Sequence, residues 1–560
     1  MYSDKPTVNL LTALMIEKGV RKVVVCPGSR NIPLVHNFSE NPCIECYPVT
    51  DERSAAFYAL GLSLATNAPV AVCVTSGSAV LNTAPAVAEA YYRHIPLVVI
   101  SADRPMEWID RQDGQTIRQN NILSGIVRHQ SDIPDCSVED ASAMSFASLS
   151  LNKCLNGCIG RNSGPAHINI QLEEPLFNFT TDQLLANTNI LPVSNETEEV
   201  STACESVINS FITSRNKLIV MGQINKSDDE LDQILRSLKE HYIVLCEPLS
   251  SKYADPFECA LPFISETFEN TVVDTVISVG GNIVSKGLKK ALRQAKIKKL
   301  FEVSRFGEPH ATFLRQTAIV ECDEKLFLAA LLKKTIEEQT AVAPIAEQLI
   351  PVLSHVAEHT DTFCPDYSQL MAVKELETSL EDMEYDFEMH YANSMAVRLG
   401  CLLSSRRYIW CNRGVNGIEG SLSTAAGFSL GVDSKVFCVI GDLSFFYDQN
   451  ALWNNMLRGN LRVMLLNNGG GCIFRRLKGL EMNEDEREFI TGEHHVNARG
   501  ICEQNDIGYL SSHNEEEFHT ALVHFLTEET SRPIVFEVFT DPDTDIRTLD
   551  QLDTFVKENI

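Results

Sequence analysis

Two apolar runs in the C-terminal third of the chain, with the polar residues that follow them, constrain the fold most. Residues 436–440 (Val-Phe-Cys-Val-Ile) and 461–466 (Leu-Arg-Val-Met-Leu-Leu) have the near-continuous apolar character of buried parallel strands. The apolar spacing of residues 448–458 predicts a crossover helix between them. The two strands are followed by Gly441-Asp442 and by Asn467-Asn468. Because ligands bind beyond the carboxyl ends of parallel strands, we expect a binding site at this edge.

The residue types at these strand ends suit a hard divalent cation. The Asp442 carboxylate, an amide oxygen of Asn468 and a backbone carbonyl in the following glycine run are oxygen ligands of the kind that Mg²⁺ takes. Such a cation usually keeps water and takes its remaining ligands from the phosphates of a substrate. An ordinary βαβ unit, in which the Asp and Asn are only turn residues, is the alternative that this stretch alone leaves open.

Composition places the chain among ordinary globular proteins and excludes some partners. A length of 560 residues favours about three domains. The net charge of −28 argues against nucleic acid as a partner, because phosphate binding needs a basic surface. The N-terminus has no secretory signal pattern, and no apolar run approaches the length of a membrane span. The 17 cysteines are scattered, many within apolar runs, which predicts reduced thiols and a cytoplasmic location.

Strand–turn–helix alternation predicts an α/β fold with three doubly wound domains and mainly parallel sheets. In the first domain, polar turns follow four expected strands, at residues 27–30, 50–53, 76–78 and 102–105, so they are expected along one edge of the sheet. Polar stretches at 176–214 and 341–366 separate the expected domains. We therefore predict domains over residues 1–180, 190–345 and 360–560.

Several motifs together resemble those of thiamine-diphosphate (ThDP) enzymes. Asp442 and Asn468 are 26 residues apart (468 − 442 = 26), which is similar to the metal–diphosphate signature of that superfamily. Within it, the chain is identified as a member of the 2-succinyl-5-enolpyruvyl-6-hydroxy-3-cyclohexene-1-carboxylate (SEPHCHC) synthase family, often called MenD. The resemblance is carried by Cys-Pro-Gly-Ser-Arg-Asn-Ile-Pro-Leu (26–34), Asp-Glu-Arg-Ser-Ala-Ala-Phe (51–57), Thr-Ser-Gly-Ser-Ala (75–79), Ala-Asp-Arg-Pro (102–105), Gln-Thr-Ile-Arg-Gln (115–119), Asn393-Ser394, Asn412-Arg413-Gly414 and Gly-Asp-Leu-Ser (441–444).

The resemblance implies a pyruvate-decarboxylase-like architecture and a transferase of EC 2.2.1.9. The implied reaction is decarboxylation of 2-oxoglutarate and 1,4-addition of the resulting succinyl-semialdehyde carbanion to isochorismate, giving SEPHCHC and CO₂ in menaquinone biosynthesis. The implied cofactors are ThDP and Mg²⁺, with Mn²⁺ possible. A homodimer, or a pair of dimers, is also implied, with each cofactor between two chains. Another ThDP-dependent 2-oxoacid decarboxylase or an acetolactate-type synthase is the alternative.

The resemblance also assigns roles to individual residues. Glu52 is the catalytic residue that would activate the cofactor's aminopyrimidine ring, although a carboxylate at a helix start can also simply complement the helix dipole. Metal ligands are Asp442, Asn468 and the Gly470 carbonyl. Cofactor contacts are assigned to Glu52, Ser76, Ile418, Gly441, Asp442, Leu443, Ser444, Asn468, Gly470, Ile473 and Phe474. Arginines suit substrate carboxylates. Contacts with 2-oxoglutarate are assigned to Ser394, Arg398 and Arg413, and contacts with isochorismate to Ser29, Arg30, Arg104, Gln115 and Lys286. Asn393 is also assigned to substrate binding.

Overall fold

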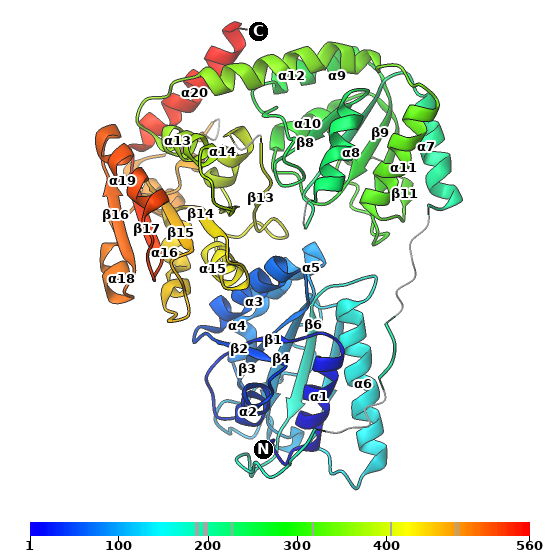
Figure 1. Ribbon diagram of the computed structural model, residues 1–560, viewed down its shortest axis with the longest axis vertical. Coiled ribbons are helices and arrows are strands. Elements are labelled where there is room, and N and C mark those ends of the chain that lie inside the picture. The colour runs from blue at the N-terminus through cyan, green and yellow to red at the C-terminus, as the bar shows by residue number, and fades with distance from the viewer. Residues whose placement is uncertain are drawn as a thin grey trace.

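The computed structural model describes residues 1–184, 190–193, 200–225, 228–315, 318–403, 406–476, 479–480 and 482–559, without the side chains of residues 475, 476 and 484. Its core consists of three sheets, each covered by helices (Figure 1). Every strand pairing within these sheets is parallel. The predicted α/β fold class with parallel sheets is confirmed.

The first sheet has six strands in the order β2-β1-β3-β4-β6-β5. The chain leaves β1 in one direction to form β2 and returns on its other side with β3, so the carboxyl ends of β1 and β3 flank a topological switch point. Its elements are α1 (Pro6–Glu17), β1 (Lys22–Val25), α2 (Ile32–Glu40), β2 (Glu45–Pro48), α3 (Glu52–Thr66), β3 (Val70–Val74), α4 (Ala79–Asn82), α5 (Ala84–Arg93), β4 (Leu97–Asp103), the 3₁₀ helix η1 (Met106–Trp108), β5 (His129–Ile133), α6 (Ala141–Ile159) and β6 (Ala166–Gln171).

The central sheet has five strands in the order β11-β10-β9-β7-β8. The helix α12 then runs across the top of the molecule from this domain towards the third one (Figure 1). The elements are α7 (Thr202–Thr213), β7 (Lys217–Met221), α8 (Asp229–Lys239), β8 (Ile243–Cys246), α9 (Leu261–Asn270), β9 (Val273–Val279), α10 (Lys286–Gln294), β10 (Ile297–Val303), β11 (Ala318–Val320), α11 (Glu324–Glu337) and α12 (Pro344–Thr362).

The third sheet repeats the topology of the first, in the order β13-β12-β14-β15-β17-β16, with its switch point between β12 and β14. The elements are α13 (Gln369–Glu381), β12 (Phe387–Tyr391), α14 (Met395–Leu403), β13 (Ile409–Trp410), α15 (Ser421–Gly431), β14 (Lys435–Gly441), α16 (Asp442–Tyr447), η2 (Gln449–Leu452), β15 (Leu461–Asn467), η3 (Cys472–Arg476), α17 (Glu484–Thr491), α18 (Arg499–Gln504), β16 (Gly508–Ser512), α19 (Glu515–Thr527), β17 (Ile534–Phe539) and α20 (Pro542–Asn559).

The crossover between β14 and β15 differs from the prediction. The α-helix begins directly at Asp442 and ends at Tyr447, and within residues 448–458 only the short η2 is helical. Asp448 directly precedes η2, but its side chain does not cap that helix. The carboxylate is buried and accepts hydrogen bonds from the Ser423 backbone N–H and hydroxyl, both at 2.7 Å. The predicted crossover helix over 448–458 was therefore wrong in position.

The first and third domains dock through α3 and α15, which lie side by side in Figure 1. Glycines allow the two backbones to touch. A Cβ on Gly61 would stand 2.1 Å from the Thr424 carbonyl oxygen, and one on Gly427 would stand 2.2 Å from the Tyr58 carbonyl oxygen. This contact fixes the position of Glu52, at the start of α3, relative to the third domain.

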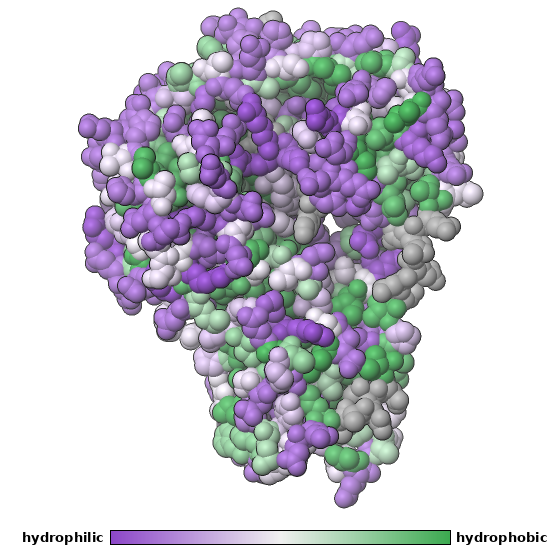
Figure 2. Space-filling view, viewed as in Figure 1, coloured by the Kyte–Doolittle hydropathy of each residue, from purple (hydrophilic) through white to green (hydrophobic). Residues whose placement is uncertain are grey.

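The surface is polar over most of the face that the central and third domains present, and more apolar residues show on the first domain (Figure 2). None of the helices in the described ranges is long and apolar enough to cross a membrane.

Candidate active site

The buried carboxylate of Asp442 joins the ends of β14 and β15. Its Oδ1 accepts a hydrogen bond from the Leu443 N–H at 2.6 Å. Its Oδ2 accepts from the backbone N–H of Gly470 at 2.9 Å and of Asn468 at 3.2 Å. The Gly-Asp turn and the Asn-Asn-Gly turn are therefore folded onto each other, as the prediction of a shared site at this edge requires.

The turn after β15 depends on glycine. Gly469 and Gly470 have φ angles of 78° and 154°, which side-chain-bearing residues rarely adopt. A Cβ on Gly470 would also stand 3.1 Å from the Thr491 carbonyl oxygen. The residues after α17 close over this turn, because the His494 N–H donates to the Gly469 carbonyl at 2.9 Å.

The oxygen atoms at this turn fit a divalent cation. The Asn468 amide group donates to Asp545 Oδ2 at 2.8 Å, which leaves its Oδ1 without a partner among the described residues. Asp442 is 3 % exposed, and His494 Nε2 lies 3.5 Å from its Oδ2. No group of three or more His, Cys, Asp and Glu within the described ranges could hold a metal ion. A magnesium site does not need one, since a carboxylate, an amide oxygen and a carbonyl suffice alongside phosphate and water.

Glu52 is the first residue of α3, directly after the N-cap Asp51, whose carboxylate accepts from the backbone N–H groups of Arg53 and Ser54. The pKa of Glu52 is raised overall, mainly by burial. The nearby charge of Asp51 also raises the pKa, while a hydrogen bond from the backbone of Glu52 itself lowers it. In the part of the chain that the structure describes, the Glu52 carboxylate has no partner besides its own backbone amide. It is therefore free to bind a ligand, with its proton held more tightly than usual.

The start of α3 lies against the segment that follows α16. Arg53 donates to the Tyr447 carbonyl at 2.7 Å, and the Asn450 amide donates to Asp51 at 2.7 Å. A cavity of about 360 Å³ lies beside this contact, lined by residues 25–28, 32, 35 and 48–50 of the first domain and 453–456 of the third. The carboxyl end of β1, which borders the first-domain switch point, is thus open to a ligand on the side of β2.

The substrate-binding candidates of the first domain gather around this switch point. Arg30 is buried and donates to the Leu172 carbonyl at 3.0 Å and to Glu174 at 3.2 Å. Burial and the neighbouring charge of Arg104 lower the pKa of Arg30, so the two guanidinium groups lie near each other. Arg104 in turn contacts Asp113 at 2.8 Å.

The two remaining polar candidates of this group, Ser29 and Gln115, are both exposed. The backbone of Gln115, with a φ of 55°, packs on Gly77, directly after the buried Ser76. Ser29 is exposed beside Arg30. The structure therefore brings Ser29, Arg30, Ser76, Arg104 and Gln115 to one edge of the first sheet.

The candidates of the third domain gather around Asn393. Its amide donates to the carbonyls of Asn412 at 2.7 Å and Gly417 at 2.8 Å, and its Oδ1 accepts from Arg413 at 3.0 Å. Asn393 therefore holds the loop that carries both Arg413 and Ile418. Ser394, with a φ of 72°, follows it directly.

Two buried guanidinium nitrogens near this loop lack protein partners. The Nε atoms of Arg413 and of Arg398, on α14, are buried and have no hydrogen-bond partner within the described residues. Such an orphaned donor is costly unless a ligand satisfies it. These arginines therefore fit a site for an anionic ligand.

The central domain reaches the same site. Arg413 lies 3.5 Å from Asn282 Oδ1, and burial together with the charge of Arg413 lowers the pKa of Lys289 on α10. The exposed Lys286 begins that helix. The backbone N–H groups just before it, of Val284 and Ser285, both donate to the buried Glu247 at 2.7 Å. Burial raises the pKa of Glu247 to about 7.

The apolar cofactor candidates are partly open. Ile418 is 41 % exposed and Phe474 is 37 % exposed, and Ile473 is half-buried beside it. Gly441 ends β14, and Leu443 and Ser444 lie in the first turn of α16. The side chains of Arg475 and Arg476, which follow Phe474, lie outside the described part.

Several residues of the site were not predicted from the sequence. They are Glu89, Arg93, Glu247, His494 and Asp545, which bind the site's loops, and of these Glu247 directly follows a strand, β8. The sequence signal of Glu89 and Arg93 was weak, since they form an ordinary i,i+4 pair on a helix.

Two family models match the outer domains. The thiamine pyrophosphate enzyme N-terminal TPP binding domain matches residues 7–122, and the thiamine pyrophosphate enzyme C-terminal TPP binding domain matches residues 393–538. Together with three parallel α/β sheets, these matches define a ThDP-dependent enzyme.

Full-length relatives narrow the class. A SEPHCHC synthase of Bacteroides thetaiotaomicron is 37 % identical over 98 % of both chains. A synthase of the same name from Porphyromonas gingivalis is 35 % identical over 96 % of this chain and 95 % of the relative. Another, from Flavobacterium psychrophilum, is 33 % identical over 96 % of this chain and 97 % of the relative. The chain belongs to the SEPHCHC synthase family, and the predicted family is confirmed.

Proposed function

We propose that this chain uses ThDP and a divalent metal ion to decarboxylate 2-oxoglutarate and add the four-carbon unit to isochorismate, forming SEPHCHC and CO₂ for menaquinone biosynthesis. The observation that carries the proposal is the gathering of arginines at the two switch points. Arg30 lies near Arg104, and Arg413 lies with its unpartnered Nε beside Asn393, in a chain whose net charge is −28. Two dicarboxylate substrates need such local cation groups.

The metal would be held by Asp442, the Asn468 amide oxygen and the Gly470 carbonyl, with Mg²⁺ the first choice and Mn²⁺ possible. Bound ThDP supplies an electron sink for decarboxylation. Glu52 would hold a proton at the aminopyrimidine ring, and its raised pKa supports that role. Other cofactor contacts would come from Ser76, Ile418, Gly441, Leu443, Ser444, Ile473 and Phe474.

Substrate binding would divide between the domains. Arg398 and Arg413, with Asn393 and Ser394, would bind 2-oxoglutarate. Arg30 and Arg104, with Ser29, Gln115 and Lys286, would bind the carboxylates and hydroxyl of isochorismate. The domain bounds 1–180, 190–345 and 360–560 belong to the same proposal, with the cofactor between the first and the third.

The test is consumption of 2-oxoglutarate by the purified chain, followed with and without ThDP, Mg²⁺ and isochorismate. Formation of SEPHCHC, detected by mass spectrometry and dependent on all three additions, is expected. Decarboxylation that ignores isochorismate and yields only an aldehyde would instead favour a simple 2-oxoacid decarboxylase.

We further propose a homodimer, or a pair of dimers, in which Glu52 of one chain serves the Asp442 site of the other. Exposed apolar side chains around the site support association. They include Leu81, Val415, Ile418, Tyr447 and Trp453, which are 39–58 % exposed.

Mixing inactive Glu52→Gln and Asp442→Ala chains tests this arrangement. A mixed dimer would contain one site with both defects and one with neither, so activity should partly return. Confirmed subunit exchange without any recovery would show that Glu52 serves its own chain.

A further inference from the structure

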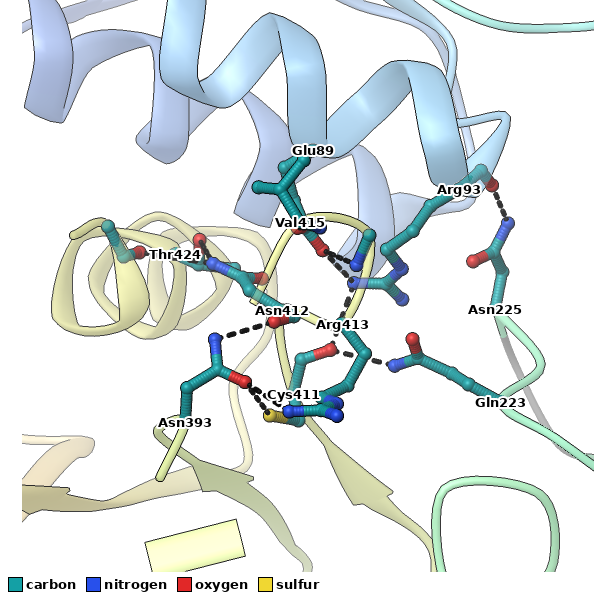
Figure 3. A network of polar contacts seen from close by, with 12 residues as sticks. Glu89, Arg93, Gln223, Asn225, Asn393, Cys411, Asn412, Arg413, Val415 and Thr424 are labelled. Carbon is teal, nitrogen blue, oxygen red and sulfur yellow. Dashed lines mark hydrogen bonds and ion pairs between the residues drawn. The ribbon is translucent and has the colours of Figure 1, made fainter. Parts of the chain in front are cut away.

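Helix α5 of the first domain holds the loop that carries Arg413 in the third domain (Figure 3). Glu89 Oε1 accepts a hydrogen bond from the Gly414 N–H, and its Oε2 accepts from the Val415 N–H, both at 2.8 Å. The Gly414 N–H belongs to the peptide that leaves Arg413. Each carboxylate oxygen therefore holds one of the two peptides that follow the arginine.

Arg93 holds the same loop on the other side of Arg413. One helical turn after Glu89, its guanidinium donates to the Cys411 carbonyl at 3.2 Å and lies 3.8 Å from the Glu89 carboxylate. The central domain adds to this contact, because Gln223 donates to the same carbonyl at 2.7 Å (Figure 3). The backbone is thus held both before and after Arg413.

The far end of the arginine side chain is held separately. Asn393 accepts from the Arg413 guanidinium at 3.0 Å, while Arg413 Nε is left without a partner in the described residues. With its backbone held by Glu89 and its tip by Asn393, Arg413 has little freedom to reorient. A fixed guanidinium binds a carboxylate with less loss of entropy than a mobile one.

The chemistry of Glu89 is unusual for a contact that only docks two domains. It is 1 % exposed, and burying a carboxylate costs free energy that apolar packing would not. The α3–α15 contact already joins the same two domains through closely packed backbones. A buried carboxylate aimed at two consecutive N–H groups gives directional control of the loop, which apolar packing does not.

We propose that Glu89 is a positioning residue for Arg413, and that it sets the guanidinium to bind the distal carboxylate of the 2-oxo acid. The inference rests on the proposed function, in which Arg413 binds 2-oxoglutarate. It adds a residue of the first domain to the specificity of a site in the third.

The test compares 2-oxoglutarate with 2-oxopentanoate, which has the same carbon chain but no distal carboxylate. The ratio of kcat/KM for the two acids measures recognition of that carboxylate. Glu89→Gln keeps the size of the side chain but turns an amide NH₂ towards one backbone N–H. We expect it to lower the ratio roughly tenfold to a hundredfold, as Arg413→Ala should, because both remove a charge-assisted contact.

Two more variants make the test specific. Gly414→Ala disturbs the contact from the loop side, because its Cβ would stand 2.7 Å from the Glu89 carbonyl oxygen and 2.9 Å from Oε2. Gly414→Ala should lower the ratio as well, and it tests the role of Glu89 if Glu89→Gln does not fold.

Glu302→Gln is the matched control. Glu302 is a buried carboxylate of the central domain that accepts from the N–H groups of His310 and Ala311, and its replacement should leave the ratio unchanged.

The double variant Glu89→Gln/Arg413→Ala should show no further loss beyond Arg413→Ala, since Glu89 acts through that arginine. ThDP affinity, measured by calorimetry, should stay within a few-fold of the unmodified chain in Glu89→Gln.

Two results would overturn the inference, and they differ in what else they affect. If Arg413→Ala lowers the ratio but neither Glu89→Gln nor Gly414→Ala does, then Glu89 only docks the domains and the proposed role of Arg413 stands. If Arg413→Ala itself leaves the ratio unchanged, then the assignment of Arg413 to 2-oxoglutarate and the role of Glu89 both fail.

Discussion

Replacing Asp442 with alanine should abolish retention of ThDP and the metal, not merely slow turnover. The carboxylate accepts three backbone hydrogen bonds, at 2.6, 2.9 and 3.2 Å, and two of them come from the turn that carries Asn468 and Gly470. A hydrogen bond to a charged group contributes about 1.5–3 kcal/mol, so losing the two bonds to the turn costs at least ~3 kcal/mol of its organisation. At 1.4 kcal/mol per factor of ten, that alone weakens binding about a hundredfold. Loss of the anionic metal ligand adds to this.

The assay is isothermal titration calorimetry of the purified variant with ThDP at fixed Mg²⁺, and with Mg²⁺ at fixed ThDP. Asp448→Asn is a useful control, because Asp448 is a buried carboxylate six residues further on that accepts from Ser423 rather than from the Asn468 turn. Its ThDP affinity should stay within a few-fold of the unmodified chain. Normal ThDP and Mg²⁺ affinity in Asp442→Ala would refute the assignment of this edge as the metal–diphosphate site.

Three further predictions concern packing, substrate sorting and pH. Gly61→Ala should lower the free energy of unfolding by about 1–3 kcal/mol, because its methyl group would stand 2.1 Å from the Thr424 carbonyl oxygen. Gly125→Ala, whose methyl group would enter open space, should not lower it. Equal denaturation midpoints for the two variants would contradict this prediction. Arg104→Ala should raise the KM for isochorismate roughly tenfold or more and spare decarboxylation of 2-oxoglutarate, and steady-state kinetics showing the reverse would place Arg104 on the other substrate. Burial lowers the pKa of His390 to about 3, so the folded protein holds the neutral form of this side chain more readily than the charged one. The resulting contribution to stability is fully present above about pH 6.5 and is lost as the pH falls from there towards 3. The loss is at most about 1.4 kcal/mol per pH unit. Between pH 7.5 and acid, the free energy of unfolding of His390→Phe should therefore fall less than that of the unmodified chain. Chemical denaturation that shows the same fall in both proteins would count against this prediction.

The strand ends of the site could be predicted from sequence because parallel strands combine two local signals. Residues 436–440 and 461–466 are apolar almost throughout since both faces of the sheet are covered, and each run stops at a polar turn. The structure has β14 and β15 at these places, with Asp442 and Asn468 just beyond the buried runs. The helix between them was misplaced because the apolar spacing of residues 448–458 is typical of a helix that begins at Asp448. Only the fold shows that its carboxylate is instead committed to Ser423, 25 residues earlier.

The residues that hold the site's loops could not be predicted, because their partners are remote and their local pattern is common. Glu89 and Arg93 have the spacing of a solvent-exposed ion pair on a helix, yet the N–H that Glu89 binds is 325 residues away in the chain. Glu247 repeats this arrangement in the central domain, where it binds the two N–H groups that precede Lys286.

The loops that present Arg413 and Lys286, two of the proposed substrate-binding cations, are therefore each held by a buried carboxylate from elsewhere in the chain. Burial lowers the pKa of Lys289, and the positive charges of Arg413 and Lys286 lower it further, so positive charge is concentrated between the two loops. Before an anionic substrate arrives, a loop with such a cation gains by turning it towards water. A carboxylate that accepts from the loop backbone, rather than from the cation, opposes that movement without neutralising the charge that the substrate must meet.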